Sequence, residues 1–221
     1  MGGCGDWALD LYLEVVMDRK DHWNKAYSGW DADSWSWFQD SAVISLSLIK
    51  ACGLGFDARL IDVGGGASTL AGELLELGYC GLSVLDISSF ALEKSRERLG
   101  EDLAGGVSWI ESDITNFSTD DRFDLWHDRA VFHFLTHADD QERYREALFK
   151  YLKPGGFLIV STFAIDGPKK CSGLDIVGHD AQSLHKVLGG DRLKMLESRE
   201  EEHVTPKGAK QKFIYGRFIR R

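Results

Sequence analysis

The chain has 221 residues, which is enough for one α/β domain with a substantial core. It carries 26 lysines and arginines against 35 aspartates and glutamates, a net charge of −9 that disfavours nucleic acid and anionic membranes as partners, because both need a basic surface. No apolar run approaches the roughly 20 residues that a transmembrane helix needs.

The N-terminus and the cysteines indicate a cytoplasmic protein. Residues 1–6 show no basic stretch followed by an apolar one, so no secretory signal is predicted. The four cysteines have no paired spacing and are predicted to be reduced thiols without a disulfide framework or a zinc site: Cys4, Cys52, Cys80 and Cys171.

The first 38 residues are predicted to form an arm ahead of the main domain. Residues 6–20 carry the apolar side chains of a helix, and residues 22–38 are unusually rich in aromatic side chains. Such a segment either packs on the core or covers a ligand pocket, because aromatic rings offer large and stiff contact surfaces. The two interpretations are compatible. An amphipathic helix over residues 40–53 then leads into the domain.

A glycine-rich turn is predicted to lie at the centre of the site. Residues 59–63 have the pattern of a buried strand, and residues 68–77 that of a helix ended by Gly78. Between them stands Gly64-Gly65-Gly66, where the missing Cβ atoms permit a sharp turn and a close approach of a ligand. The start of the following helix favours a carboxylate or a phosphate.

Alternating strands and helices follow this turn, and a hairpin ends the chain. Strands are predicted over residues 82–85, 107–110, 123–126 and 157–163. Helices are predicted over residues 89–99, 139–152 and 181–188; Gly100 ends the first, and Asp139 with Glu142 resembles a capping box at the start of the second. Residues 193–204 and 213–219 are predicted to pair around a turn at 205–208.

Acidic side chains follow four of the predicted strands. They are Asp62, Asp86, Asp113 and the pair His127-Asp128. In an open α/β sheet, ligands bind outside the carboxyl ends of the strands. Asp86 lies about 20 residues beyond the glycine turn, where a dinucleotide-binding fold places the acid that binds ribose hydroxyls.

The glycine pattern decides between two nucleotide-type ligands. Gly64-x-Gly66-x-x-Thr69 lacks the third glycine of the nicotinamide dinucleotide fingerprint. Asp62 would sit poorly beside a pyrophosphate but suits an amino group. A ligand with an adenine, a ribose, an amino group and a carboxylate, but no phosphate, therefore fits better, and S-adenosylmethionine is that ligand.

Over roughly residues 40–220 the chain resembles the class I S-adenosylmethionine-dependent methyltransferases. The matching segments are Ile61-Asp62-Val63-Gly64-Gly65-Gly66-Ala67-Ser68, Leu85-Asp86, Ser112-Asp113-Ile114, Phe123-Asp124-Leu125 and Leu152-Lys153-Pro154-Gly155-Gly156. The resemblance implies an α/β, Rossmann-like, seven-stranded and mostly parallel sheet with a C-terminal antiparallel hairpin and helices on both faces. It implies one domain over residues 1–221, with residues 1–38 as arm or lid and 39–221 as the cofactor-binding core.

The resemblance also assigns cofactor contacts. Asp62 and the glycine turn, with Ser68 in the place of the family's last glycine, are expected to hold the methionine end. Asp86 and Ile87 are expected at the ribose, and Asp113 with Ile114 at the adenine. The arm is weakly similar to the entry segment of protein-lysine methyltransferases, which adds Trp23 and Tyr27 as expected cofactor neighbours.

A residue after the fourth strand faces the methyl group in this fold. His127 and Asp128 are therefore predicted to position the acceptor or to remove its proton, and His127 also to contact the cofactor. For Asp128, an ion pair with Arg129 or a helix cap is the alternative. No metal is expected, because His133 and His137 have no third ligand and Phe134 stands where a metalloprotease needs Glu.

We expect methyl transfer to a nucleophilic S, N or O of a small-molecule acceptor. No inserted substrate domain is visible, so residues 22–38 and the loop over residues 164–180 must form the acceptor pocket. The alternative enzyme is a protein-lysine N-methyltransferase, which the arm favours. A different class of function, a non-catalytic module with the cofactor fold, is disfavoured by the three aspartates. Neither nucleic acid nor a membrane is expected as a partner, and the sequence does not specify the oligomeric state.

Overall fold

The structure, a computed structural model, describes residues 19–28 and 35–221. The helix expected over residues 6–20 lies almost entirely outside the described residues, and residues 19–28 are helical. The three described cysteines, Cys52, Cys80 and Cys171, are free thiols, and Cys4 lies outside the described part. Among the helices that the structure describes, none has the length and apolar character to cross a membrane.

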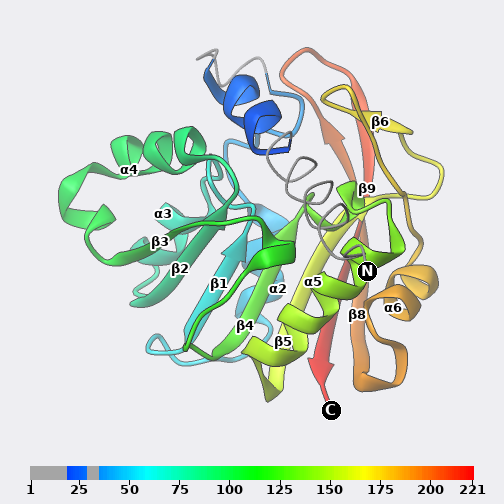
Figure 1. Cartoon of the computed structure of the whole chain (residues 1–221). Coiled ribbons are helices and arrows are strands. Elements are labelled where there is room, and N and C mark those ends of the chain that lie inside the picture. The colour runs from blue at the N-terminus through cyan, green and yellow to red at the C-terminus, as the bar shows by residue number, and fades with distance from the viewer. Residues whose placement is uncertain (1–18, 29–34) are drawn as a thin grey trace, which may run out of the picture.

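Seven strands form one sheet in the order β3-β2-β1-β4-β5-β9-β8 (Figure 1). The strands are β1 (Arg59–Val63), β2 (Gly81–Asp86), β3 (Val107–Glu111), β4 (Phe123–Arg129), β5 (Leu152–Phe163), β8 (Leu193–Val204) and β9 (Lys210–Arg220). Strands β1 to β5 pair in parallel, and β9 runs antiparallel to both β5 and β8. The predicted mostly parallel sheet with a C-terminal antiparallel hairpin is confirmed.

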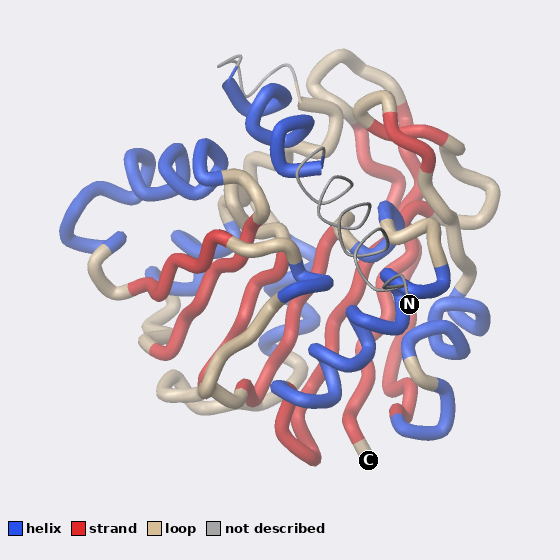
Figure 2. The backbone as a smooth tube through the Cα atoms, viewed as in Figure 1, coloured by secondary structure: helices blue, strands red, loops and turns tan. Residues whose placement is uncertain are grey.

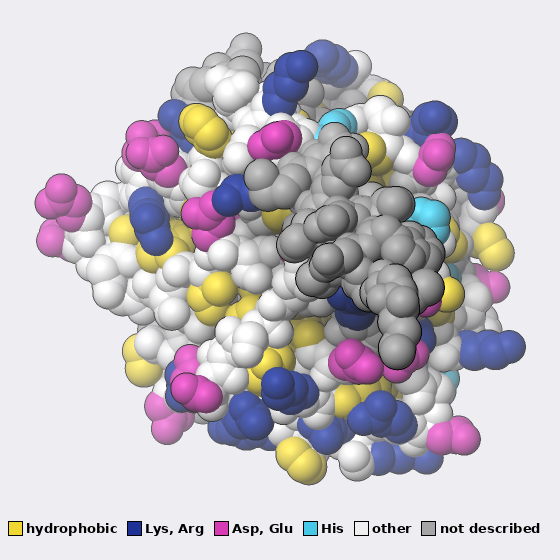
Figure 3. Space-filling model, in the orientation of Figure 1, with side chains coloured by type: hydrophobic (Ala, Val, Ile, Leu, Met, Phe, Trp, Pro, Cys, Tyr) yellow, Lys and Arg dark blue, Asp and Glu magenta, His cyan; other side chains and the backbone are white. Residues whose placement is uncertain are grey.

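Helices cover both faces of the sheet (Figure 2). They are α2 (Val43–Lys50), α3 (Leu70–Glu76), α4 (Ser89–Ala104), α5 (Ala138–Tyr151) and α6 (Ala181–Leu188). One apolar cluster joins α2, α3 and α4 to one face, and a second joins α5 and α6 to the other. On the face seen in Figure 3, acidic and basic side chains are interspersed.

Short elements complete the fold. Among the described residues, 3-10 turns η2 (Ile114–Asn116) and η3 (Phe132–Phe134) follow β3 and β4 at their carboxyl ends, and η4 (Gly190–Arg192) precedes β8 at the other edge of the sheet. The predicted loop over residues 164–180 contains a small antiparallel ladder of β6 (Lys170–Cys171) and β7 (Leu174–Asp175).

One predicted helix boundary is confirmed and one was wrong. Gly100 has φ 75° and ψ 161°, which is not helical, so it breaks α4 where the sequence predicted an end, and a second helical segment follows it. Helix α5 begins one residue early, with His137 at the N-cap and no side-chain cap bond. The predicted capping box therefore does not form, because Asp139 already lies in the first turn.

Alternate residues of β4 point to opposite faces of the sheet. Leu125 belongs to the cluster under α2–α4, and Trp126 belongs to the cluster under α5 and α6. The alternation continues, since His127 contacts Ser45 of α2 while Asp128 contacts Tyr144 of α5. The two neighbouring residues that the sequence suggested for catalysis therefore lie in different environments.

The strand order reverses at β1, which lies between β2 and β4. Such a reversal opens a crevice outside the carboxyl ends of the neighbouring strands. Open α/β sheets bind their ligands in this crevice. Asp62 in β1 stands opposite His127 in β4, and Asp86 ends β2. The topology thus brings residues far apart in the sequence to one edge of the sheet.

Candidate functional site

Two adjoining cavities lie at this edge, one of about 360 Å³ and one of about 40 Å³. Both are lined by Tyr27, Trp37, Gly64 and Arg129. Of the other residues expected at the site, the larger cavity is lined by Trp23, Asp86, Ile87, Asp113 and Ile114, and the smaller by Asp62, Gly65, Ser68 and His127. Gly66 and Asp128 line neither cavity.

The glycine turn is crowded on three sides. Gly64 has φ +71°, and a Cβ there would overlap a methyl group of Val131. A Cβ on Gly65 would overlap the carboxylate of Asp62, and one on Gly66 would lie 2.6 Å from a carboxylate oxygen of Asp86. Only glycine therefore lets the turn pass between these side chains.

The N–H groups of this turn are already used within the protein. Gly64 and Gly65 donate to the carbonyl oxygen of Leu85 at 2.7 and 3.3 Å. Gly66 donates to the carboxylate of Asp86 at 3.0 Å, and the amide of Ser68 donates to the carbonyl oxygen of Gly65 at 3.0 Å. The turn shapes the cavity, but these four amides do not form the carboxylate site that the sequence suggested.

A buried chain of three polar side chains orients Asp62. The Nδ1 atom of His127 lies 2.6 Å from Oδ1 of Asp62, and its Nε2 atom lies 2.8 Å from the hydroxyl of Ser45. With the proton on Nδ1, the ring donates to Asp62 and accepts from Ser45. Nothing in the sequence pattern indicates Ser45, which is 82 residues from His127 and lies on α2.

One oxygen of Asp62 remains available. Its Oδ2 atom is buried and has no hydrogen-bond partner among the described residues. A buried carboxylate oxygen without a partner is uncommon and costly, and Asp62 lines the smaller cavity. This oxygen can accept a hydrogen bond from a further donor. Ser45 itself is 1% exposed and lines neither cavity, so the Ser–His–Asp chain cannot present a nucleophile to a substrate.

Asp86 is buried, and burial raises the pKa of its carboxyl group to about 6. Its two oxygens accept the amide hydrogens of Gly66 at 3.0 Å and Ser88 at 2.9 Å, and each keeps a further lone pair for a hydroxyl donor. The hydroxyl of Ser88 donates to Oδ1 of Asn24 at 2.8 Å, which ties the arm to the end of β2.

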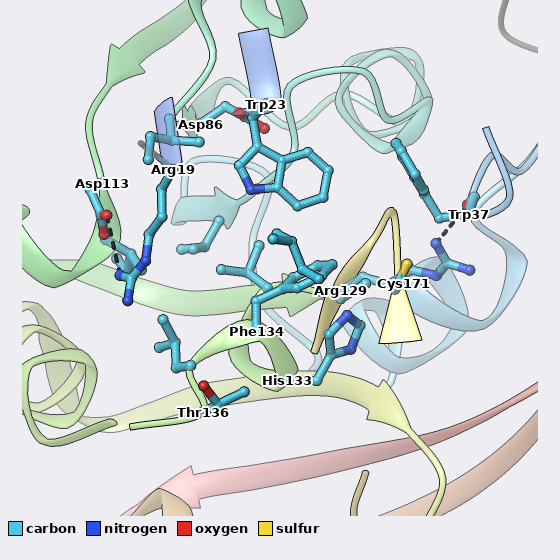
Figure 4. A pocket seen from close by; sticks show the side chains of 18 of the residues that line it. Arg19, Trp23, Trp37, Asp86, Asp113, Arg129, His133, Phe134, Thr136 and Cys171 are labelled. Atoms are coloured by element: carbon cyan, nitrogen blue, oxygen red, sulfur yellow. Dashed lines mark hydrogen bonds and ion pairs between the residues drawn. The ribbon is translucent and has the colours of Figure 1, made fainter. Parts of the chain in front are cut away.

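Asp113 holds the turn η2 and meets the arm. Its Oδ1 atom accepts from the amide and the hydroxyl of Thr115, both at 2.8 Å. Its Oδ2 atom lies 3.6 Å from a guanidinium nitrogen of Arg19, and Figure 4 shows Arg19 reaching toward Asp113 along the larger cavity. Arg19 also forms an ion pair with Asp140 of α5, so the arm is attached across the cavity.

Aromatic side chains of the arm form one wall of the site. Trp23 packs edge-to-face on Phe134 with ring centroids 5.0 Å apart, and Tyr27 packs on Trp35 at 4.9 Å. Burial, and then the nearby Asp86, raise the pKa of Tyr27 well above its usual value, so its phenol stays neutral. The arm residues 19–28 and 35–37 therefore both pack on the core and cover the cavities.

Asp128 is fully buried and has a partner at each oxygen. One oxygen accepts from the amides of Val131 at 3.0 Å and Phe132 at 3.4 Å, and the other accepts from the hydroxyl of Tyr144 at 2.7 Å. Burial raises the pKa of Asp128 to about 6. This geometry fits the capping alternative: Asp128 holds the turn after β4, in which Ala130 has φ 70°.

Arg129 lies where the two cavities meet. Its Nε atom donates to the hydroxyl of Tyr215 at 3.0 Å, and Nη1 donates to the carbonyl oxygen of Trp37 at 2.9 Å. Its Nη2 atom has no hydrogen-bond partner among the described residues and lies 3.9 Å from a carboxylate oxygen of Glu201. Arg129 is thus fixed by the protein and still has a donor for an anionic group.

His133 was considered in the sequence only as a metal ligand. It lies in η3, whereas His137 is the N-cap of α5, so the two do not share a helical face. His133 is fully buried and lines the larger cavity. Neither of its ring nitrogens has a hydrogen-bond partner in the described part of the chain. Burial, and then the charge of Arg129, lower the pKa of His133 to about 3.

Comparison with known proteins identifies the family and several relatives. The family model described as "Methyltransferase domain" matches residues 56–220. The ubiquinone/menaquinone biosynthesis C-methyltransferase UbiE of Proteus mirabilis is 31% identical over 120 residues, which cover 52% of this chain and 47% of that protein. The chain spans about half the length of the curated relatives that it matches first. EEF1A lysine methyltransferase 2 of Danio rerio is 25% identical over 180 residues, 72% of this chain and 77% of that protein.

A solved structure with a bound ligand shares this fold. The 1,6-didemethyltoxoflavin-N1-methyltransferase of Burkholderia thailandensis, with bound 1,6-didemethyltoxoflavin and S-adenosylhomocysteine, superimposes with a TM-score of 0.64. The alignment covers 100% of this chain and 91% of that chain at 18% sequence identity. At this identity the match shows the fold.

Proposed function

The chain belongs to the methyltransferase domain family, and from the geometry of its site we propose that it uses S-adenosylmethionine to methylate a nucleophilic S, N or O of a small-molecule acceptor. The observation that carries the proposal is the buried Oδ2 atom of Asp62 beside the glycine turn, which has no hydrogen-bond partner among the described residues, together with Asp86 in the adjoining cavity. A cationic amino group and a ribose are the two features that such a pair would recognise together.

The residues at the two cavities fit the parts of this cofactor. Asp62 Oδ2 would accept from the amino group, and the carboxylate of Asp86 would accept from the ribose hydroxyls. Asp113 and Ile114 would contact the adenine at the far end of the larger cavity. The carboxylate of the methionine end would pair with Nη2 of Arg129, because the amides of the glycine turn are occupied.

The chain contributes alignment and the exclusion of water. When bound, the cofactor would supply a methyl group on a sulfonium to an acceptor atom that carries a free lone pair, and sulfur would keep the electrons of the broken bond. Trp23 and Tyr27 cover the site, and Arg19 attaches the arm across it, which keeps water from the reacting atoms. His127 positions Asp62, and Asp128 positions the turn over residues 130–134. We therefore propose positioning roles for both.

A second candidate is a protein-lysine N-methyltransferase. The similarity to EEF1A lysine methyltransferase 2 over 72% of this chain favours it, as does the aromatic arm. Against it, the names of the Proteus mirabilis and Burkholderia thailandensis proteins refer to small molecules.

We further propose that residues 39–221 act as one cofactor-binding domain with residues 1–38 as its lid. The continuous sheet and the arm contacts to β2, η2 and α5 support this organisation. A cytoplasmic location is proposed on the free thiols of the described cysteines. The net charge of −9 favours a small molecule over nucleic acid as the partner.

Transfer of a tritiated methyl group tests the proposal. The purified chain is incubated with labelled S-adenosylmethionine and a cell lysate, and the label is followed into organic-extractable products and into protein bands. We expect the label in extractable products. Label confined to protein bands would establish the lysine alternative, and failure of the chain to bind S-adenosylmethionine in calorimetry would favour a non-catalytic module.

A further inference from the structure

The larger cavity extends well beyond the expected cofactor contacts. In Figure 4, Asp113 and Arg19 lie on one side, and His133 lies with Arg129 and Cys171 on the other. We call this second side the acceptor pocket, and its aromatic wall consists of Trp23, Trp37, His133, Phe134, Phe163 and Phe213. The pocket is formed by segments that are far apart in the sequence: the arm, η3, β5 and β9.

The rings of this wall pack on one another. His133 stacks on Phe163 with centroids 4.8 Å apart and planes at 26°, and Phe163 stacks on Phe213 at 4.4 Å and 29°. Phe134 packs on His133 with centroids 4.4 Å apart and meets Trp23 at 77°. Planar aromatic molecules gain most from such surfaces, because both stacked and edge-to-face contacts are available.

His133 is the exceptional member of the wall. It is fully buried, and both ring nitrogens lack a partner among the described residues although the side chain borders the cavity. Buried polar atoms are almost always hydrogen-bonded in native proteins. The stack on Phe163 fixes the plane of the imidazole, and both unpartnered nitrogens lie in that plane.

The charge state of His133 limits the partner. Its pKa lies far below neutrality, so the ring is uncharged and has one donor and one acceptor. Arg129 and His179 are the titratable groups that act on it most, and both oppose a positive charge. A hydroxyl or a ring N–H matches a neutral imidazole, whereas an ammonium group would add a second positive charge beside Arg129.

We propose that His133 is the hydrogen-bonding anchor for a planar aromatic acceptor that carries a hydroxyl or a ring N–H group. The proposal rests on the proposed function, because the molecule held there is the methyl acceptor. His133 fixes the acceptor in the acceptor pocket through one ring nitrogen, and the surrounding rings pack against it. This makes His133 a specificity-determining residue, whereas the Asp62–His127–Ser45 chain serves the cofactor.

His179 provides a matched control. Like His133, it is buried and has an unpartnered Nε2 atom, and burial lowers its pKa. Unlike His133, it does not line either cavity. A change at His179 therefore removes a comparable imidazole without removing a contact to the acceptor.

The test compares two probes of nearly equal shape, 6-hydroxyquinoline and 6-methylquinoline, by calorimetry at pH 7.5 with S-adenosylhomocysteine at saturation. We expect the wild-type chain to bind the hydroxyl probe about tenfold more tightly, the effect of one hydrogen bond to a buried polar group. The preference disappears in His133→Phe and in His133→Leu, and it persists in His179→Phe. His133→Gln keeps part of it, because an amide also donates and accepts.

Separate titrations with S-adenosylhomocysteine keep the two proposals distinguishable. All variants are expected to bind it as the wild type does, which also shows that they are folded. Absence of binding by the wild type contradicts the proposed function. Retained binding without a hydroxyl preference in the wild type, or with an unchanged preference in both His133→Phe and His133→Leu, overturns the anchor role alone.

Discussion

The two sides of the larger cavity are stabilised in different ways. On the cofactor side, Asp86 and Asp113 follow β2 and β3, and the backbone nearby satisfies most of their oxygens. On the acceptor side, rings from four separate elements meet around His133, whose nitrogens have no partner in the described chain. The first side is thus held by backbone hydrogen bonds, while the second depends on the packing of side chains.

The largest expected effect is on the stability of the folded chain at low pH. The pKa of His133 is depressed in the folded state, so the unfolded chain binds its proton more tightly and stability is lost as pH falls from about 6.5 toward 3. In His133→Phe this loss is absent. Between pH 6.5 and 4.5 the variant should gain about 2 kcal/mol in free energy of unfolding relative to the wild type. Urea unfolding at several pH values measures this difference in free energy of unfolding between His133→Phe and the wild type.

The buried aspartates respond to pH in the opposite sense. The pKa values of Asp86 and Asp128 are raised to about 6, so their contribution is largest below the unfolded value near 4 and declines as pH rises to 6. Asp86 and Asp128 are present in both the wild type and His133→Phe. Their contribution therefore cancels when the free energies of unfolding of the two proteins are subtracted. If the difference in free energy of unfolding between His133→Phe and the wild type does not change with pH, His133 is not depressed in pKa. The proposed difference between the two sides of the cavity would then be wrong.

The second prediction concerns the cofactor side. Asp86→Ala removes the acceptor for the ribose hydroxyls and should weaken binding of S-adenosylhomocysteine by about tenfold in calorimetry. Asp175→Ala is the control, because Asp175 is an exposed carboxylate that lines the same cavity near the acceptor pocket. Equal losses of affinity for S-adenosylhomocysteine in the two variants would show that both aspartates act only through the overall negative charge of the cavity.

The third prediction sharpens the role of the buried polar chain. Asp62→Asn keeps an oxygen but loses the charge that the amino group meets, and the expected loss of affinity for S-adenosylhomocysteine is about fivefold. Ser45→Ala removes only the hydroxyl beyond His127 and should cost about twofold. In the double variant the two effects should not add, since Ser45 acts through the orientation of Asp62. Full additivity would contradict this coupling.

The smallest expected effect is at the arm. Arg19 joins the arm to Asp113 and Asp140, so Arg19→Met should raise the dissociation rate of S-adenosylhomocysteine about threefold in stopped-flow measurements. Lys20→Met is the matched control, because the ion pair of Lys20 with Glu111 is largely exposed and exposed pairs contribute little. If the two variants release the ligand at the same rate as the wild type, the arm does not act as a lid.

The sequence predicted the fold well for a physical reason. Strands, helices and the glycine turn are set by local periodicity, and Asp62 and Asp86 lie within 25 residues of each other along the chain. The family resemblance is confirmed by the match over residues 56–220. The parallel order of the strands then follows from the alternation of strands and helices.

The remaining features depend on contacts that have no local pattern. The fourth strand was expected to end at Trp126, but β4 extends to Arg129, and strand alternation therefore sends His127 and Asp128 to opposite faces. The unpartnered nitrogens of His133 become visible only when the surrounding elements are in place. Sequence periodicity carries no information on which polar atoms remain unsatisfied.

A structure of the chain with S-adenosylhomocysteine tests the central claim most directly. We expect the amino group within about 3 Å of Oδ2 of Asp62, the ribose hydroxyls on the carboxylate of Asp86, and the sulfur facing the acceptor pocket beside His133. A ligand bound in the reverse direction, with its adenine at Asp62, or a ligand outside the two cavities, would contradict the account.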